Sequence, residues 1–226
     1  MAVLETRVWS STIGKKAVMG VTGLVLLLYV IAHMLGNLKF FFGPTSIDGY
    51  AAWLRTIVDG LLGHGGFLWG TRAVLVGSVV LHMTAATQLA RRAHKARPAA
   101  YQHRRKIQGS YAARTMRWGG VILGLFVVYH ILDLTTGTLN PNGVQGQVYA
   151  NLTADFRLWY VVLFYTAAVV SLGFHIRHGM WSALQSLGAS SATRQRALQL
   201  TSLGVALAIT VGYLSVPFAV LTGLVA

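Results

Sequence analysis

Long apolar stretches separated by short polar connections dominate this chain. Five stretches are about 20 residues or longer, the length that an α-helix needs to cross the roughly 30 Å hydrocarbon core of a bilayer. They cover about 17–42, 67–90, 116–135, 158–184 and 198–221. Lipid offers no hydrogen-bond partners to a backbone, so such stretches must be helical. The pattern predicts an all-α, polytopic membrane protein whose single domain, 1–226, is a bundle of five transmembrane helices.

The polar connections carry the composition of loops. Residues 43–66 and 136–156 are rich in glycine, proline or asparagine, and within the first of them 50–62 can form a short amphipathic surface helix. Lys15 and Lys16 precede the first apolar stretch, which is much longer than the roughly 7–15 apolar residues of a signal peptide. We therefore expect that stretch to be a retained first transmembrane helix.

The charges support a membrane location and predict an orientation. The net charge is +14, but only 11% of the residues are charged, against about 25% in a soluble domain. Nine of the 19 Lys and Arg residues lie within 91–117, the connection between the second and third apolar stretches and the start of the third. The positive-inside rule then puts the N-terminus in the cytoplasm and the C-terminus outside. As a separate expectation, we place the protein in the inner membrane of a prokaryote. Since the basic residues follow the connections in this way, we do not expect nucleic-acid binding.

The absence of cysteine limits the redox chemistry of the chain. With no cysteine, it has no disulfides, no cysteine zinc site and no cysteine-bound iron–sulfur cluster. A cofactor that carries electrons here must be held by histidine or methionine.

Four histidines interrupt four different apolar stretches, where an ionisable residue is costly and indicates a function. Along their helices, His33 and His130 lie about 21–24 Å from the inner ends, whereas His82 and His175 lie only about 12–14 Å from them. Paired histidines from facing helices can bind a haem iron from both sides. The two depths predict two b-type haems, an outer one bound by His33 and His130 and an inner one bound by His82 and His175.

Other interpretations stay open at this stage. A single histidine in a transmembrane helix is often a hydrogen-bonded packing residue, and four of them could bind one haem or relay protons in a haem-free transporter. Glycines such as Gly23 and Gly120 could make room for a flat macrocycle or simply allow close helix packing.

Several further residues are candidates for contacts with haem propionates or a quinone. Haem propionates are anionic and need cationic partners near the inner boundary. His178 lies three residues after His175 on nearly the same helix face. The propionate or quinone candidates are His178, Arg177, Lys15, Lys16, Ser11 and His64, with Asp59 and Asp133 as further guesses for the quinone.

Three segments resemble the cytochrome b558 subunit of succinate dehydrogenase, the membrane anchor of succinate:quinone oxidoreductase. The first begins at Ser10 and ends in the His33-x-x-Gly36-Asn37-Leu38 pattern, the second is YHILDL around His130, and the third is 174–188. The resemblance implies a five-helix, two-haem anchor with His33, His82, His130 and His175 as ligands in the pairs above, and it favours His175 over His178.

The resemblance also implies partners. In that family a flavoprotein with covalent FAD and an iron–sulfur protein sit on the cytoplasmic face, and electrons from succinate reach a membrane quinone, often menaquinone. Some members carry an acidic residue just before the fourth ligand, whereas 171–174 here contain none. The resemblance thus implies a subunit of an enzyme of the tricarboxylic acid cycle. We expect this subunit to perform electron transport but no dicarboxylate chemistry. The complex can form a higher oligomer. The alternative is a cytochrome b subunit of a hydrogenase or formate dehydrogenase.

Overall fold

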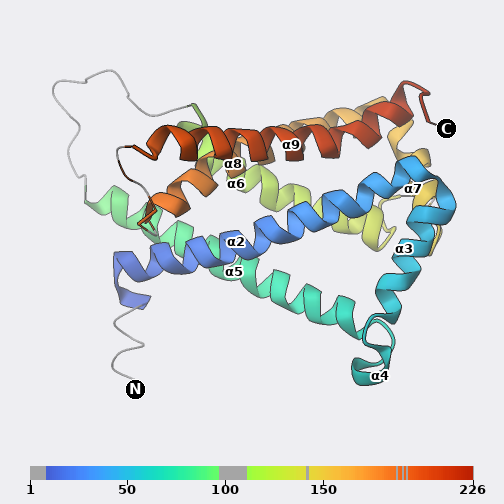
Figure 1. The fold of residues 1–226 in the computed structure, drawn as a ribbon, viewed down its shortest axis with the longest axis horizontal. Coiled ribbons are helices and arrows are strands. Elements are labelled where there is room, and N and C mark those ends of the chain that lie inside the picture. The colour runs from blue at the N-terminus through green and yellow to red at the C-terminus, as the bar shows by residue number, and fades with distance from the viewer. Residues whose placement is uncertain are drawn as a thin grey trace.

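The computed structural model describes residues 9–96, 111–140, 143–186, 188–189, 191 and 193–225. Within these residues the protein is helical and has no strand (Figure 1). Five helices are long and apolar enough to cross a membrane, which indicates a multi-pass membrane protein. The predicted all-α fold with five spans is confirmed to that extent.

The five long helices follow the predicted apolar stretches to within a few residues. Two of them continue into a different kind of turn: α2 into a 3-10 segment, η1 (Leu38–Phe42), and α6 into a π-helical segment, η2 (Ile131–Thr135). The long helices are α2 (Thr12–Asn37), α5 (Gly66–Lys95), α6 (Tyr111–His130), α8 (Trp159–Ser186) and α9 (Gln195–Leu221).

Local chemistry explains where the first span begins and ends. The Ser11 side chain caps α2 by accepting a hydrogen bond from the Gly14 backbone N–H at 2.8 Å. After η1, Gly43 adopts a φ of +86°, a conformation that side chains disfavour. The chain then enters α3 (Pro44–Thr56), where proline is well placed because the first helical N–H needs no partner.

Both predicted loops contain more helix than expected. The first holds α3 and a single turn, α4 (Asp59–Leu62), separated by a break at Val58, which has a φ of 56°. The expected amphipathic helix over 50–62 is therefore wrong as one continuous element. The second loop ends in α7 (Val148–Phe156), whose apolar residues Leu152 and Phe156 are buried. Tertiary packing, which the local composition does not report, stabilises this short helix.

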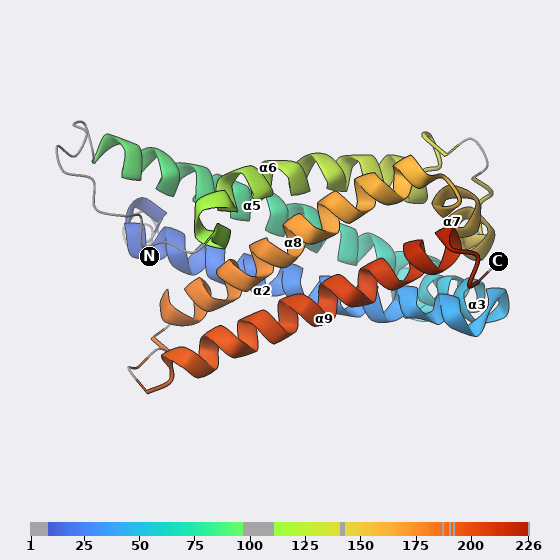
Figure 2. The ribbon, with the colours of Figure 1, turned by 90° about the horizontal axis from the view of Figure 1, so that it is seen from above.

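The long helices are arranged in two unequal groups. α5 packs along α2, while α8 packs between α6 and α9 (Figures 1 and 2). The groups meet where α2 contacts α8 and α9, whereas α5 has no extensive contact with α6 or α8 among the described residues. α2 begins at one end of the bundle and α9 finishes at the other, as an odd number of crossings requires (Figure 2).

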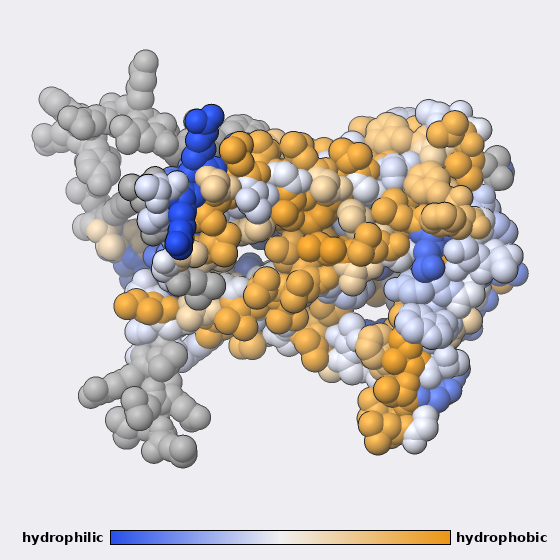
Figure 3. Space-filling model, in the orientation of Figure 1, coloured by the Kyte–Doolittle hydropathy of each residue, from blue (hydrophilic) through white to orange (hydrophobic). Residues whose placement is uncertain are grey.

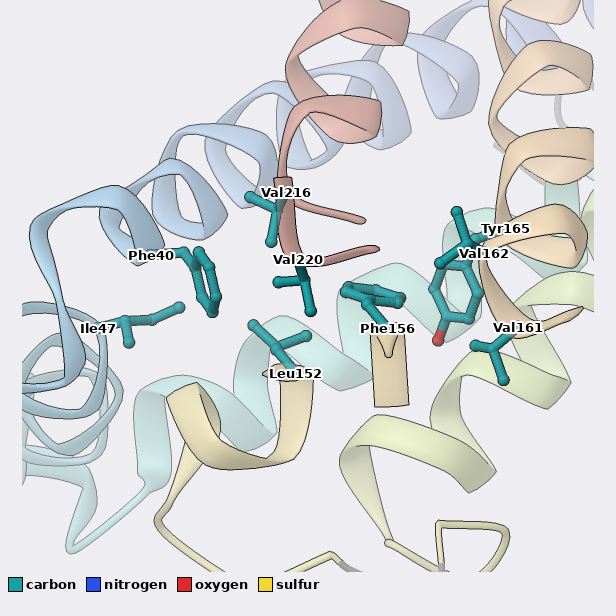
Figure 4. Packing of buried hydrophobic residues seen from close by; sticks show 9 residues of the cluster. All are labelled: Phe40, Ile47, Leu152, Phe156, Val161, Val162, Tyr165, Val216 and Val220. Atoms are coloured by element: carbon teal, nitrogen blue, oxygen red, sulfur yellow. The ribbon is translucent and has the colours of Figure 1, made fainter. Parts of the chain in front are cut away.

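The apolar side chains form two inner clusters and a lipid-compatible surface. The larger cluster closes the bundle at the α3 and α7 end, where Phe40, Phe156 and Tyr165 meet the last turns of α9 (Figure 4). The smaller one, around Ile176 and Ile209, joins α2, α8 and α9. Large apolar side chains cover the middle of the visible face, and hydrophilic residues lie toward its ends (Figure 3). Such a surface suits hydrocarbon and not water.

Part of the predicted charge asymmetry falls outside the described residues. Arg7 and the basic residues within 97–110 belong to those parts of the chain. The orientation of the termini relative to the cytoplasm stays a prediction.

Candidate functional site

The four membrane histidines lie in two pairs inside the bundle. His33 on α2 faces His130 at the end of α6, with ring centroids 5.9 Å apart and ring planes at 75°. His82 on α5 faces His175 on α8, with centroids 6.3 Å apart and planes at 53°. These are the two pairs that the depths along the helices predict.

Each pair bridges helices whose backbones do not pack together. Among the described residues, α2 has no extensive contact with α6, and α5 has none with α8. The imidazoles therefore extend from opposite walls into the space between the helices. All four histidines are partly exposed, although they lie within membrane spans.

The ring spacing suits a metal ion between the two imidazoles of each pair. A metal–imidazole bond is about 2 Å long, and a nitrogen lies about 1 Å from its ring centre, so two trans imidazoles have centroids roughly 6 Å apart. The separations of 5.9 and 6.3 Å match this value. Two neutral imidazoles on opposite sides are the ligand set of an electron-transfer haem.

Hydrogen bonds orient His82 for such a role. Its Nδ1 lies 3.0 Å from the Met19 carbonyl oxygen and 3.3 Å from the Thr22 hydroxyl. The Thr22 hydroxyl donates to the Val18 carbonyl at 2.7 Å, so it can only accept from His82. Nδ1 therefore carries the proton, and the Nε2 lone pair is free for a metal, as in other metal-bound histidines.

A longer hydrogen-bonded chain fixes His130. The Tyr165 hydroxyl donates to Asp133 Oδ2 at 2.9 Å, which leaves its oxygen free to accept from His130 Nδ1 at 3.3 Å. The proton on Nδ1 again leaves Nε2 unprotonated. Because Asp133 is carried by the π-helical turn directly after His130, the ligand candidate and its supporting carboxylate come from one short segment.

The other two ligand candidates have different surroundings. His33 stacks on Tyr29, with centroids 5.4 Å apart and planes at 9°. The Nδ1 atoms of His175 and His178 are buried and have no hydrogen-bond partner among the described residues. His178 packs edge-on against Trp181 at 5.9 Å and is not part of either pair.

Two glycines leave room at the second pair. A Cβ atom at Gly23 would lie 3.2 Å from His82 Cε1, and one at Gly120 would lie 3.8 Å from His175 Cε1. One turn before Gly23, a Cβ at Gly20 would have nothing within 4 Å. Gly23 therefore sets the position of an imidazole, whereas Gly20 does not.

Two cavities lie between helices of the bundle, and one of them is lined by a histidine of the second pair. One of about 280 Å³ lies between α6 and α8 and is lined by Gly119, Ser171 and His175 among others. Another of about 350 Å³ lies between α2 and α5 and includes Tyr29, the residue that stacks on His33. A flat hydrophobic ligand beside the histidines would use space of this kind.

The remaining candidates from the sequence lie apart from the pairs. Lys15 is buried, hydrogen-bonded to Gln88, and its Nζ lies 4.4 Å above the Trp9 ring. Ser11 caps α2, and His64 pairs with Asp59 at 3.5 Å in an exposed loop. Lys16 and Arg177 are exposed.

The sequence candidates include Asp133 but neither Tyr165, which links it to His130, nor Asp155. Asp133 and Asp155 are 2% and 5% exposed. An aspartate at the end of an apolar stretch is the signal that could have drawn attention to this cluster.

Comparison with protein-family models, curated proteins and solved structures found no match. The function must therefore be inferred from the residues of this chain.

Proposed function

We propose that this protein is a di-haem cytochrome b membrane anchor that passes electrons between an iron–sulfur partner subunit and a membrane quinone. The observation that carries the proposal is the histidine spacing. Two pairs, each drawn from helices that do not pack on one another, have the separation that a metal between them requires.

The residues of the chain would hold and insulate the cofactors. Two b-type haems, when bound, supply one-electron carriers in two layers of the membrane. His33 and His130 would hold one iron, and His82 and His175 would hold the other. Each pair would supply two neutral imidazole ligands, a set that suits electron transfer. The hydrogen bonds of His82 and His130 fix the tautomer that presents Nε2 to the metal.

The proposed host complex is succinate:quinone oxidoreductase. The resemblance of the first span, of the segment around His130 and of 174–188 to its anchor subunit supports that assignment. A flavoprotein with FAD and an iron–sulfur protein would then dock on the cytoplasmic face, where the N-terminus lies. The electron acceptor or donor in the membrane would be a quinone, menaquinone in this branch.

Spectra and haem content of the purified full-length protein test the proposal. We expect a b-type α-band in the dithionite-reduced minus oxidised difference spectrum and two haems per chain. His33→Ala and His82→Ala should each reduce the content to one haem. His64→Ala is the matched control, because His64 lies in an exposed loop, and should keep both haems.

The same assay separates the two neighbouring histidines of α8. His175→Ala should lose one haem, whereas His178→Ala should retain two, because only His175 faces a partner imidazole. A wild-type protein without an α-band, or four histidine variants with unchanged haem content, would refute the cytochrome function.

Isolation of the intact complex tests the proposed partners. A co-purifying flavoprotein with covalent FAD and an iron–sulfur protein would support succinate:quinone oxidoreductase. A nickel- or molybdenum-bearing partner would replace that assignment by the hydrogenase or formate dehydrogenase type, and the haem ligands would be unaffected.

A further inference from the structure

Two buried carboxyl groups meet at the α3 and α7 end of the bundle. Asp133, in the π-helical turn after α6, is 2% exposed, and Asp155, in the last turn of α7, is 5% exposed. The Asp133 carboxyl lies beside that of Asp155. Tyr165 also donates its hydroxyl proton to Asp133 at 2.9 Å.

No ion pair in the described part of the chain offsets a negative charge on both of these buried carboxyl groups. No N–H or O–H donor of the described residues reaches Asp155 Oδ2, which is buried. The ion pair found in the described part of the chain joins His64 to Asp59, so no cation there neutralises the two aspartates. Two adjacent buried carboxylates without a cation strongly favour keeping one proton.

The groups around the pair do not supply a compensating charge. The phenols of Tyr129 and Tyr165, from α6 and α8, are titratable neighbours of the pair. On α3, which packs on α7, Asp48 is a further carboxyl group, and it accepts a hydrogen bond from the Tyr149 backbone N–H at 3.0 Å. From α9, the same cluster receives the apolar side chains of Val216 and Val220. Burial, together with the adjacent Asp133 carboxyl, raises the pKa of Asp155 to about 7. The proton is therefore exchangeable near neutral pH.

The pair is connected to the nearest histidine. Asp133 accepts from Tyr165, whose oxygen lies 3.3 Å from His130 Nδ1. Two residues after Asp155 the chain is exposed, at Arg157. A charge change at His130 would thus be felt by the pair.

We infer that Asp133 and Asp155 together bind one exchangeable proton, and that the deprotonated pair takes up this proton when the metal held by His130 gains an electron. The inference rests on the proposed function, which supplies the electron from a redox partner. One-electron reduction of the metal would be accompanied by formation of one O–H bond on the pair, with the proton supplied by the surrounding water. Oxidation reverses both changes, so charge and atoms balance.

Infrared spectroscopy tests the shared proton without any haem. In the purified full-length protein, the carbonyl stretch of a protonated carboxylic acid should disappear as the pH rises through about 7. Asp155→Asn should lack this titrating band. Asp59→Asn is the matched control and should keep it, because Asp59 is exposed and lies outside the cluster. An unchanged band in the Asp155→Asn protein would overturn the shared proton.

Spectroelectrochemical titration tests the coupling. The reduction potential of the haem bound by His33 and His130 should fall as pH rises from about 6 to 8. Full coupling would change the redox equilibrium tenfold per pH unit, which is about 59 mV for one electron. Asp155→Asn should flatten the slope of this haem and leave the His82–His175 haem as it was, and Asp59→Asn should preserve the slope.

The outcomes separate the two proposals. A haem-containing wild-type protein whose potential ignores pH, or an Asp155→Asn protein with the wild-type slope, would overturn the coupling while the cytochrome function stands. A protein without haem would refute the proposed function and the coupling with it, and the infrared titration would still decide whether the two aspartates share a proton.

Discussion

Replacing Tyr165 by phenylalanine isolates the contribution of the hydrogen-bonded chain behind His130. The substitution removes one oxygen atom and keeps the ring, which packs among Phe126, Tyr129 and Phe156. It breaks two hydrogen bonds, the one donated to Asp133 at 2.9 Å and the longer one accepted from His130 Nδ1 at 3.3 Å. Cavity formation is therefore a minor effect here.

The two broken bonds predict different magnitudes. Asp133 is almost fully buried, and a hydrogen bond to a charged group contributes about 1.5–3 kcal/mol, so we expect a loss of stability in that range. Removal of the group that orients a metal-binding histidine weakens metal affinity about 10–100-fold. Because the bond to His130 is long, we expect the lower end of that range. Without the hydrogen bond, His130 donates less electron density to iron, which weakens its binding to oxidised iron more than to reduced iron. The reduction potential of its haem should therefore rise, by about 59 mV for each tenfold decrease in the ratio of the two affinities.

Redox titration of the purified protein, with the two haems resolved spectrally, measures this shift. Tyr213→Phe is the matched control. It also removes a hydroxyl from a tyrosine inside the bundle, one that donates to the Val30 carbonyl at 2.7 Å, but it leaves His130 Nδ1 untouched. Tyr165→Phe should move only the His33–His130 haem, and Tyr213→Phe should lower stability without that selective shift. Equal shifts of both haems in Tyr165→Phe, or none, would refute the reasoning.

Two further predictions concern Gly23 and Asp155. Gly23→Val places a branched side chain where even a Cβ atom would lie 3.2 Å from His82 Cε1. The haem content should therefore fall from two to about one per chain. Gly20→Val is the control and should keep two haems, because a Cβ atom there has nothing within 4 Å. Since the pKa of Asp155 rises from 3.8 to about 7 on folding, the folded state binds the extra proton, and thermal stability in detergent should fall as pH increases from about 4 to 7. The pKa shift corresponds to at most ~4 kcal/mol in the free energy of unfolding, and to about half of that with solvent screening. Asp155→Asn should remove the pH trend. A stability that rises between about pH 4 and 7 would contradict the prediction.

The long helices were predictable because hydrophobic length is a property of each segment alone. The spans and the pairing of histidines by depth follow from counting residues along helices. The helices in the connections were not predictable in this way. α7 forms because Leu152 and Phe156 reach Phe40 and Val220, which are distant in sequence, and composition near Asn140 and Gly143 indicates only a turn.

The residues that support the candidate site could not be predicted from the sequence, because they are distant from it along the chain. Tyr165 lies 35 residues from His130, and nothing in its local sequence distinguishes it from the other aromatic residues of the fourth span. Asp155 belongs to the predicted loop 136–156, and a carboxylate in a loop is usually exposed to water. Only the burial of that loop against α9 and η1 turns Asp155 into a partner for Asp133.

The fifth span, α9, has no histidine, and its contacts explain why the bundle needs it. The Thr210 side chain of α9 occupies the space that a Cβ atom at Gly173 of α8 would need. In the same way, the Met34 side chain of α2 occupies the space that a Cβ atom at Gly212 of α9 would need. Tyr213 adds a hydrogen bond to the Val30 carbonyl of α2. α9 thus fixes α2 to α8 at close range, while α5 and α6, which carry one histidine of each pair, pack on opposite sides of that unit. A metal bound between two imidazoles requires that the helices carrying them stay at a constant distance. We infer that α9, which carries no histidine, maintains this distance.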